Sequence, residues 1–238
     1  MRKTGEFICK YKSIYSTIST YSINSCVISR DGSTVVASGI LYTSISQKEE
    51  TITGHVFSYS INNSTVSSLG DVDLTTGCMR VAVTDTGQYW ATSLHDGSCM
   101  LFNHANPNEM EWQCTPVILG LELAYAVDIT QTDGGDVYMA CGANLSGTRN
   151  GGFLYLVKSI PPVTTDNSAT KSTGVIQWST YIQYGVNLGV SVDKNATYVT
   201  ATDGKSDGKT INESAGSFYL FNASNGNMIW QKQTYMMN

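Results

Sequence analysis

A four-part pattern recurs along this chain, and its clearest copy is GSFYLFNASNGNMIWQ at residues 216–231. In that copy a glycine precedes alternating aromatic and aliphatic residues, followed by an Asn/Ser/Gly turn and a second apolar run that ends in Trp230. Weaker copies begin at Gly54, Gly97 and Gly152. A pattern that recurs in this way is the signature of a repeat architecture, in which each copy forms one supersecondary unit.

A β-hairpin is expected before each copy. The first strand of each hairpin runs into a turn within CVISRDG, VAVTDTG, VDITQTDGG and VSVDKNA, at residues 26–32, 81–87, 127–135 and 190–196. The second strand begins at Thr34, Tyr89, Val137 and Tyr198. Apolar residues that alternate with small or polar ones across a turn of Asp, Asn and Gly predict a hairpin. This alignment places a small residue at one shared position of the second strand, namely Ala37, Thr92, Ala140 and Ala201.

A fourth strand carries a tryptophan in three of the copies: Trp112, Trp178 and Trp230. The corresponding stretch after Gly54, STVSSLGDVDL, lacks it. Four short antiparallel strands per unit predict an all-β fold, a β-propeller or propeller segment built of four-stranded blades. We expect a single domain over residues 1–238, with repeat units at approximately 14–70, 71–118, 119–182 and 183–238.

The first residues repeat the end of the pattern. GEFICKYKS at 5–13 aligns without gaps with GNMIWQKQT at 226–234, which predicts a surplus outer strand. Three arrangements would accommodate it: a larger propeller, two copies joined in an eight-bladed ring or continuous array, or a strand that closes a small four- or five-bladed ring. Because an unpaired strand edge invites aggregation, we expect this strand to be paired, and the first two arrangements are favoured.

The units resemble the blades of PQQ-like and WD40-like β-propellers. The resemblance rests on the hairpin, the small-residue strand, the Gly-led third strand ending in Leu-Phe-Asn and the Trp-bearing strand. The resemblance covers nearly the whole chain. The Trp-Asp dipeptide and the Gly-His signature of WD40 repeats do not recur, so the PQQ-like branch is the better match. The resemblance implies a fold rather than a function, because such propellers include quinoprotein dehydrogenases, assembly factors, lectin-like modules and scaffolds.

No catalytic set emerges from the sequence. Of the three histidines, His55, His95 and His104, only His95 neighbours a carboxylate, Asp96, and no Gly-x-Ser-x-Gly elbow is present. We interpret all three as polar structural residues. The quinoprotein resemblance would imply a metal ion and usually a vicinal disulfide, but the chain has no adjacent cysteines. We therefore expect neither enzymatic activity nor a cofactor, and no catalytic or metal-binding residue.

Two acidic groups were considered as cation sites. Calcium is usually held by six to eight oxygens, often from alternating acidic residues. The stretch DGKSDGKTINE fits this only loosely, because Lys205 stands where a ligand would be expected. We interpret it as a solvated loop, and Asp71 and Asp73 as a turn after an outer strand.

Composition excludes several partners. A formal net charge of −5 with scattered basic residues argues against nucleic acid, which requires clustered Lys and Arg. No apolar run reaches the roughly 18 to 20 residues of a membrane helix, and the N-terminus lacks the apolar region of a signal peptide. The six cysteines are isolated and form no Cys-x-x-Cys motif; they allow 15 disulfide connectivities, although most are interpreted as small buried side chains.

Six N-glycosylation sequons favour an extracellular or cell-surface protein, with the cytoplasm as the alternative. They lie at Asn62, Asn63, Asn144, Asn195, Asn212 and Asn222.

Long connections between the second and third strands, at 42–53, 143–150 and 203–215, are expected on one face, where binding residues tend to concentrate. The expected interaction residues are Gln47, Lys48, Glu49, Glu50, Arg149, Asn150, Asp203, Lys205, Asp207, Lys209 and Glu213. The segment 161–173 should lie on the opposite face.

These features predict a non-catalytic structural or interaction module. It is expected to bind a protein partner or itself, through the blade edges and the face that carries the three long connections. A glycan-binding, lectin-like propeller is the first alternative, and a quinoprotein-type dehydrogenase the second.

Overall fold

The computed structural model describes residues 19–46, 49–63, 65–115, 121–145, 151–161, 171–183, 189–203 and 215–235. Within these ranges the chain forms sixteen β-strands and no helix, which confirms the all-β prediction. None of the described segments is therefore a helix that could cross a membrane. The predicted surplus strand at residues 5–13 lies outside the described residues.

The strands form four antiparallel sheets, each built of four strands in chain order. The first sheet contains β1 (Ser19–Ile28), β2 (Thr34–Ser46), β3 (Glu49–Asn62) and β4 (Thr65–Leu74). The second contains β5 (Cys78–Val83), β6 (Tyr89–Leu94), β7 (Cys99–Asn103) and β8 (Met110–Cys114). The third contains β9 (Leu121–Gln131), β10 (Val137–Leu145), β11 (Gly152–Ile160) and β12 (Thr173–Ile182). The fourth contains β13 (Gly189–Val192), β14 (Tyr198–Thr202), β15 (Ala215–Asn222) and β16 (Met228–Tyr235). The predicted unit boundary between residues 70 and 71 falls inside β4.

The hairpin turns form where the Asp, Asn and Gly residues predict them. Gly87 has a φ of 69°, a left-handed conformation that glycine adopts without steric cost, and its N–H donates to the carbonyl of Thr84. In the fourth sheet the turn is held by Asp193, whose carboxylate accepts hydrogen bonds from the N–H groups of Thr197 and Tyr198, both at 2.6 Å. These local interactions set the register of each hairpin.

One predicted alignment is wrong. Ala37 pairs with Phe57, and Ala201 pairs with Tyr219, but in the third sheet Cys141, not Ala140, pairs with the equivalent residue, Tyr155. The reason is that β9 and β10 remain paired past the part of the hairpin that all four sheets share, as far as Gln131 and Val137. This longer hairpin shifts the start of the second strand relative to the other units, which residue matching alone does not reveal.

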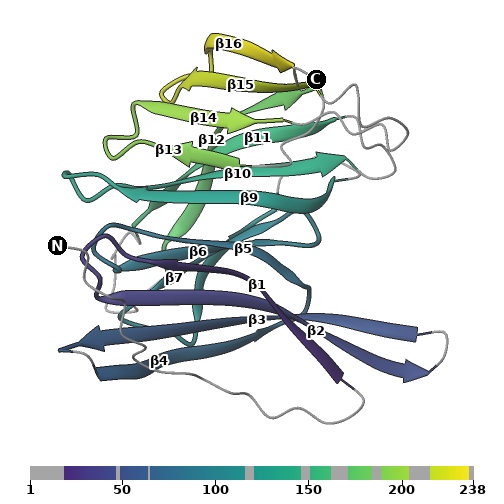
Figure 1. The fold of residues 1–238 in the computed structure, drawn as a ribbon. Coiled ribbons are helices and arrows are strands. Elements are labelled where there is room, and N and C mark those ends of the chain that lie inside the picture. The colour runs from purple at the N-terminus through teal and green to yellow at the C-terminus, as the bar shows by residue number, and fades with distance from the viewer. Residues whose placement is uncertain are drawn as a thin grey trace, which may run out of the picture.

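The sheets pack face to face in chain order, because each first strand contacts the next: β1 with β5, β5 with β9, and β9 with β13. Three hydrophobic clusters fill the three interfaces between consecutive sheets. Figure 1 shows the first sheet at one end of the molecule and the fourth at the other. The four sheets thus form an open segment of a propeller, as the fold prediction allowed.

The outer-strand tryptophans join consecutive sheets. Trp112 of the second sheet donates its indole N–H to the hydroxyl of Ser159 in the third, at 3.1 Å. Trp178 of the third sheet donates in the same way to the carbonyl of Ala223 in the fourth, at 2.6 Å. A glycine lies against each ring, since a Cβ on Gly174 would stand 2.6 Å from a carbon of Trp112 and one on Gly226 would stand 2.7 Å from a carbon of Trp178.

We predict that Gly174→Ala destabilises the protein by about 1–3 kcal/mol, because the added methyl group overlaps the buried Trp112 ring and forces the sheets apart. Gly174 needs no left-handed backbone, so the effect is one of space alone. The free energy of urea unfolding measures it. Gly134→Ala is the matched control, because its added Cβ would meet only the Thr132 hydroxyl at 3.7 Å. Equal stability of the two variants would contradict this role for Gly174.

Candidate functional site

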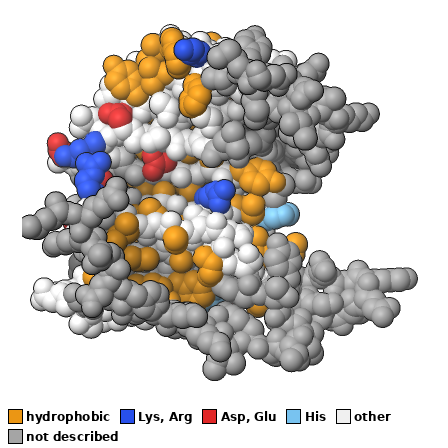
Figure 2. Space-filling view, viewed as in Figure 1, with side chains coloured by type: hydrophobic (Ala, Val, Ile, Leu, Met, Phe, Trp, Pro, Cys, Tyr) orange, Lys and Arg blue, Asp and Glu red, His pale blue; other side chains and the backbone are white. Residues whose placement is uncertain are grey.

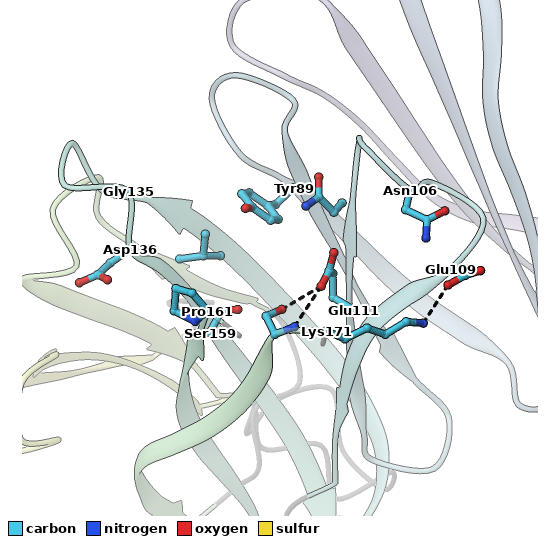
Figure 3. A pocket seen from close by; sticks show the side chains of 12 residues that line it. Tyr89, Asn106, Glu109, Glu111, Gly135, Asp136, Ser159, Pro161 and Lys171 are labelled. Carbon is cyan, nitrogen blue, oxygen red and sulfur yellow. Dashed lines mark hydrogen bonds and ion pairs between the residues drawn. The ribbon is translucent and has the colours of Figure 1, made fainter. Parts of the chain in front are cut away.

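A groove opens between the second and third sheets, on the face that carries the turns between third and fourth strands (Figure 3). Its volume is about 410 Å³. The side chains that line it come from both sheets and are mainly polar, with one aromatic ring, Tyr89. They are Tyr89, Asn103, Asn106, Glu109 and Glu111 from the second sheet, and Gly135, Asp136, Val137, Ser159, Pro161, Lys171 and Ser172 from the third.

Ion pairs fix the rim of this groove. Lys171 contacts Glu109 at 3.1 Å and also donates to the carbonyl of Met110 at 3.0 Å, which joins the two sheets. The hydrogen bond from Lys171 lowers the pKa of Glu109. On the other side Lys158 contacts Asp136 at 2.7 Å, and this hydrogen bond raises the pKa of Lys158. Both lysines are thus held at the rim by carboxylates.

Glu111 gives the groove its negative charge. Its carboxylate accepts hydrogen bonds from the hydroxyl of Ser172 at 3.0 Å and from the N–H of Ser172 at 3.3 Å, so neutral donors hold it in place. Burial raises the pKa of the nearby Tyr89 phenol, and the negative charge of Glu111 raises it further. Three carboxylates line the groove, at residues 109, 111 and 136. Lys171 and Lys158 pair with those of Glu109 and Asp136, which leaves the Glu111 carboxylate without a lysine partner among the described residues. A cation is therefore the ligand group that this surface attracts.

Among the described residues, the histidine that contacts carboxylates is His55, not His95 as the sequence suggested. The carboxylate of Asp96 accepts from the N–H and hydroxyl of Ser98, at 2.9 and 2.6 Å, and so belongs to a turn rather than to His95. Asp71 and Asp73 were expected in a turn, but they lie within β4 and contact the His55 ring. The alternation of β4 continues through Leu74, which places both aspartates on one face of the strand. Among the described residues no cluster of three or more His, Cys, Asp and Glu is arranged to hold a metal ion.

The predicted loop residues are only partly described. Asp203 is buried at the end of β14, where its carboxylate accepts from the N–H of Ser217 at 2.7 Å and the hydroxyl of Tyr219 at 2.5 Å. This carboxylate therefore holds β14 and β15 together. Glu49 and Glu50 begin β3. Outside the described residues lie Gln47, Lys48, Arg149, Asn150, Lys205, Asp207, Lys209 and Glu213.

The sequons differ in accessibility. Asn62, Asn63 and Asn195 are exposed, whereas Asn144 and Asn222 are half-buried. The Asn222 side-chain carbonyl accepts from the N–H and hydroxyl of Ser224, at 2.8 and 2.7 Å. Asn212 lies outside the described residues, and glycosylation stays a prediction for all six.

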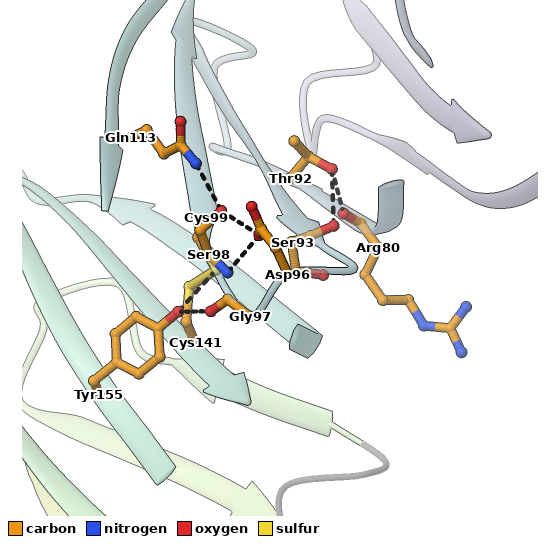
Figure 4. The surroundings of a disulfide bond; sticks show 10 residues. All are labelled: Arg80, Thr92, Ser93, Asp96, Gly97, Ser98, Cys99, Gln113, Cys141 and Tyr155. Atoms are coloured by element: carbon orange, nitrogen blue, oxygen red, sulfur yellow. Dashed lines mark hydrogen bonds between the residues drawn. A yellow bond between two sulfur atoms is a disulfide. The ribbon is translucent and has the colours of Figure 1, made fainter. Parts of the chain in front are cut away.

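A disulfide joins Cys99 of the second sheet to Cys141 of the third (Figure 4). The sequence left 15 pairings open, and only the packing of β7 against β10 selects this one. Beside it the buried Tyr155 hydroxyl donates to the carbonyl of Gly97 at 3.1 Å. Burial raises the pKa of Cys78 to about 12 and that of Cys114 to about 11, so both thiols stay protonated at neutral pH, in keeping with their interpretation as buried apolar side chains.

We predict that reduction of the Cys99–Cys141 disulfide lowers the free energy of unfolding by up to about 4 kcal/mol, because the cross-link joins residues 42 apart and restricts the unfolded chain. Urea unfolding with and without dithiothreitol measures this loss. Cys141→Ser should abolish the response to the reductant, whereas Cys26→Ser, at an exposed free cysteine, should retain it. A wild-type protein whose stability is insensitive to dithiothreitol would contradict the assignment.

No protein-family model matches this sequence, and no curated protein sequence matches it. Solved structures of WD40 β-propeller proteins do match its fold. The β-propeller domain of Cps50 (Swd1) from Myceliophteria thermophila matches over 88% of this chain and 72% of its own, at 10% identity and a TM-score of 0.45. The structure of U3-55K matches over 90% of this chain and 52% of its own, at 10% identity and a TM-score of 0.50. The chain therefore spans about half the length of U3-55K.

At this identity the likeness shows the fold alone. Together with the four open four-stranded sheets, it shows an all-β propeller segment. The predicted PQQ-like branch is not shown by these matches and stays a prediction.

The sequence analysis did not predict the groove itself. Its lining residues come from turns and strand ends that are far apart in the chain, and none of them forms a motif with its neighbours in sequence. The one usable signal was the segment 161–173, which was expected on this face, and Lys171 and Ser172 do contribute from it.

Proposed function

We propose that this chain is a non-catalytic interaction module, and that the groove between its second and third sheets binds an extended, positively charged segment of a protein partner. WD40 propellers typically act as interaction modules of this kind. The observation that carries the proposal is the Glu111 carboxylate, which no lysine or arginine pairs among the described residues, whereas Glu109 and Asp136 are paired with Lys171 and Lys158.

The arrangement of the groove suits a peptide. Glu111 is held by hydrogen bonds to Ser172 without a lysine or arginine partner among the described residues, so it can accept an incoming guanidinium or ammonium group. Tyr89 offers an aromatic surface beside it, which favours a cation further. The flanking ion pairs restrain the rim before binding, which reduces the entropic cost of ordering it.

The connections at 143–150 and 203–215 are a second proposed contact surface, supported by their length alone. The stretch 42–53 is not part of it, because its residues 42–46 and 49–53 are the paired ends of β2 and β3 instead of the predicted loop. No contact among the described residues supports the lectin-like or the dehydrogenase alternative.

A test uses a fluorescent ten-residue peptide in which Arg alternates with Ser, and the same peptide with citrulline in place of Arg. We expect the Arg peptide to bind and the citrulline peptide not to bind, with an affinity that falls as salt rises because exposed charges are screened. The variant carrying Glu109→Gln and Glu111→Gln should weaken binding about tenfold or more, since it removes two charge-assisted contacts. Fluorescence polarisation measures the dissociation constant.

Asp85→Asn provides the control, because Asp85 is an exposed carboxylate that pairs with Arg30 away from the groove. This variant should bind the Arg peptide as the wild type does. Binding of the Arg peptide that is unchanged in the double variant, or equal binding of both peptides, would refute the groove as the contact site.

A further inference from the structure

We propose that the exposed face of the fourth sheet binds the first sheet of a second copy of this chain, with Trp230 at the centre of the contact. Two copies joined in this way at both ends would form a ring of eight four-stranded sheets. This contact is separate from the groove and does not rest on the function proposed for it.

The argument begins with a row of three paired residues that recurs in the sheets. In the second sheet Ala91 pairs with Leu101, and Leu101 pairs with Trp112. In the third the corresponding row is Ala140, Leu156 and Trp178, and in the fourth it is Thr200, Leu220 and Trp230. In all three sheets a register shift follows directly after the leucine. The three rows are therefore equivalent positions of one repeated unit.

Each of the first two rows packs against the next sheet. The row of Trp112 belongs to the cluster between the second and third sheets, and the row of Trp178 packs into the cluster between the third and fourth. Both tryptophans donate an indole hydrogen bond to equivalent residues of the next sheet, Ser159 and Ala223, and both contact a glycine there. In two of the sheets, therefore, this row packs against the face of the next four-stranded sheet.

The third row has no such neighbour among the described residues. The Trp230 side chain is 49% exposed, and in the described part of the chain no group accepts a hydrogen bond from its indole. Phe218 beside it is 50% exposed, and the two rings border a largely apolar groove of about 400 Å³. Figure 2 shows the hydrophobic side chains gathered at this end of the molecule, over β15 and β16. An apolar patch of this kind on a sheet face marks an interaction surface.

The innermost strand of the first sheet, β1, offers a complementary surface. Its β1 carries Cys26 and Ile28, which are exposed and equivalent to Val190 and Val192 of β13, the strand that receives the third sheet. The N–H of Ile61 donates to the carbonyl of Ser33 as the N–H of Ala223 donates to that of Thr197. The carbonyl of Ile61 therefore stands where an incoming Trp230 would find its acceptor.

The charges of the two faces and the number of sheets favour a second copy of this chain as the partner. Lys232 follows Trp230 by two residues on the exposed face of β16, while Asp73 is 87% exposed on the corresponding face of β4. Propellers typically have four to eight blades. Two copies of the four described sheets reach the upper end of that range and three copies would exceed it, so a ring of two copies is the assembly that fits the described sheets.

The first test is the native mass of the purified protein at micromolar concentration. We expect a dimer, and we expect Trp230→Ala to raise its dissociation constant about 30-fold or more, as for aromatic residues at the centre of an interface. Val175→Ala is the matched control, because Val175 is an exposed apolar residue on the outer strand of the third sheet. A monomeric wild type, or an equal effect of the two substitutions, would overturn the proposal.

A second test identifies the faces in contact. Ala140 of β10 and Val190 of β13 pack in one cluster, and their equivalents across the proposed contact are Thr200 and Cys26. Thr200→Cys should therefore form covalent dimers with a short bis-maleimide, and these should be lost when Cys26→Ser is added. Covalent dimers that persist without Cys26, or a failure to form any, would exclude this pairing of faces. Trp230→Ala should leave Arg-peptide binding by the groove unchanged in affinity, which keeps the two proposals distinguishable.

Discussion

The contact between an outer-strand tryptophan and the next sheet is the interaction on which the rest of this structure depends. A four-stranded sheet has two faces, and one sheet cannot bury both by itself. Trp112 and Trp178 each cross to the following sheet, where a glycine leaves room for the ring and an oxygen accepts the indole hydrogen bond. These contacts set the position of the third sheet on the second and of the fourth on the third, so these two interfaces are equivalent.

The groove and the disulfide both belong to the first of these two interfaces. Trp112 donates to Ser159, which lines the groove, so the contact that joins the second and third sheets also shapes the groove between them. The Cys99–Cys141 disulfide joins the same two sheets. This interface is therefore restrained by packing, a hydrogen bond and a covalent bond at once. A binding surface supported by rigid elements loses less entropy when a partner binds.

The two end sheets differ from the inner sheets in what covers their faces. An inner sheet has neighbours on both faces, but the first and fourth sheets have a described neighbour on one face only. The fourth sheet keeps the Leu220–Trp230 pair that binds a neighbour elsewhere in the molecule. The surface that this leaves exposed has the composition of an internal interface, which supports the proposed contact with a second copy of the chain.

The sequence alone determined the all-β class, the four repeats, the hairpin turns and the shared tryptophan position, because these follow from local spacing and from the backbone preferences of Gly, Asn and Asp. Residue matching aligned Ala140, instead of Cys141, with the small residue on the second strand of the other units. A longer hairpin changes the register without changing the pattern of residue types. The tertiary structure alone decided that Cys99 meets Cys141, that Asp203 is buried, and that Glu109, Glu111 and Lys171 share a groove. The physical reason is distance along the chain: these groups meet only when whole sheets stack, and no local signal encodes which sheet faces supply them.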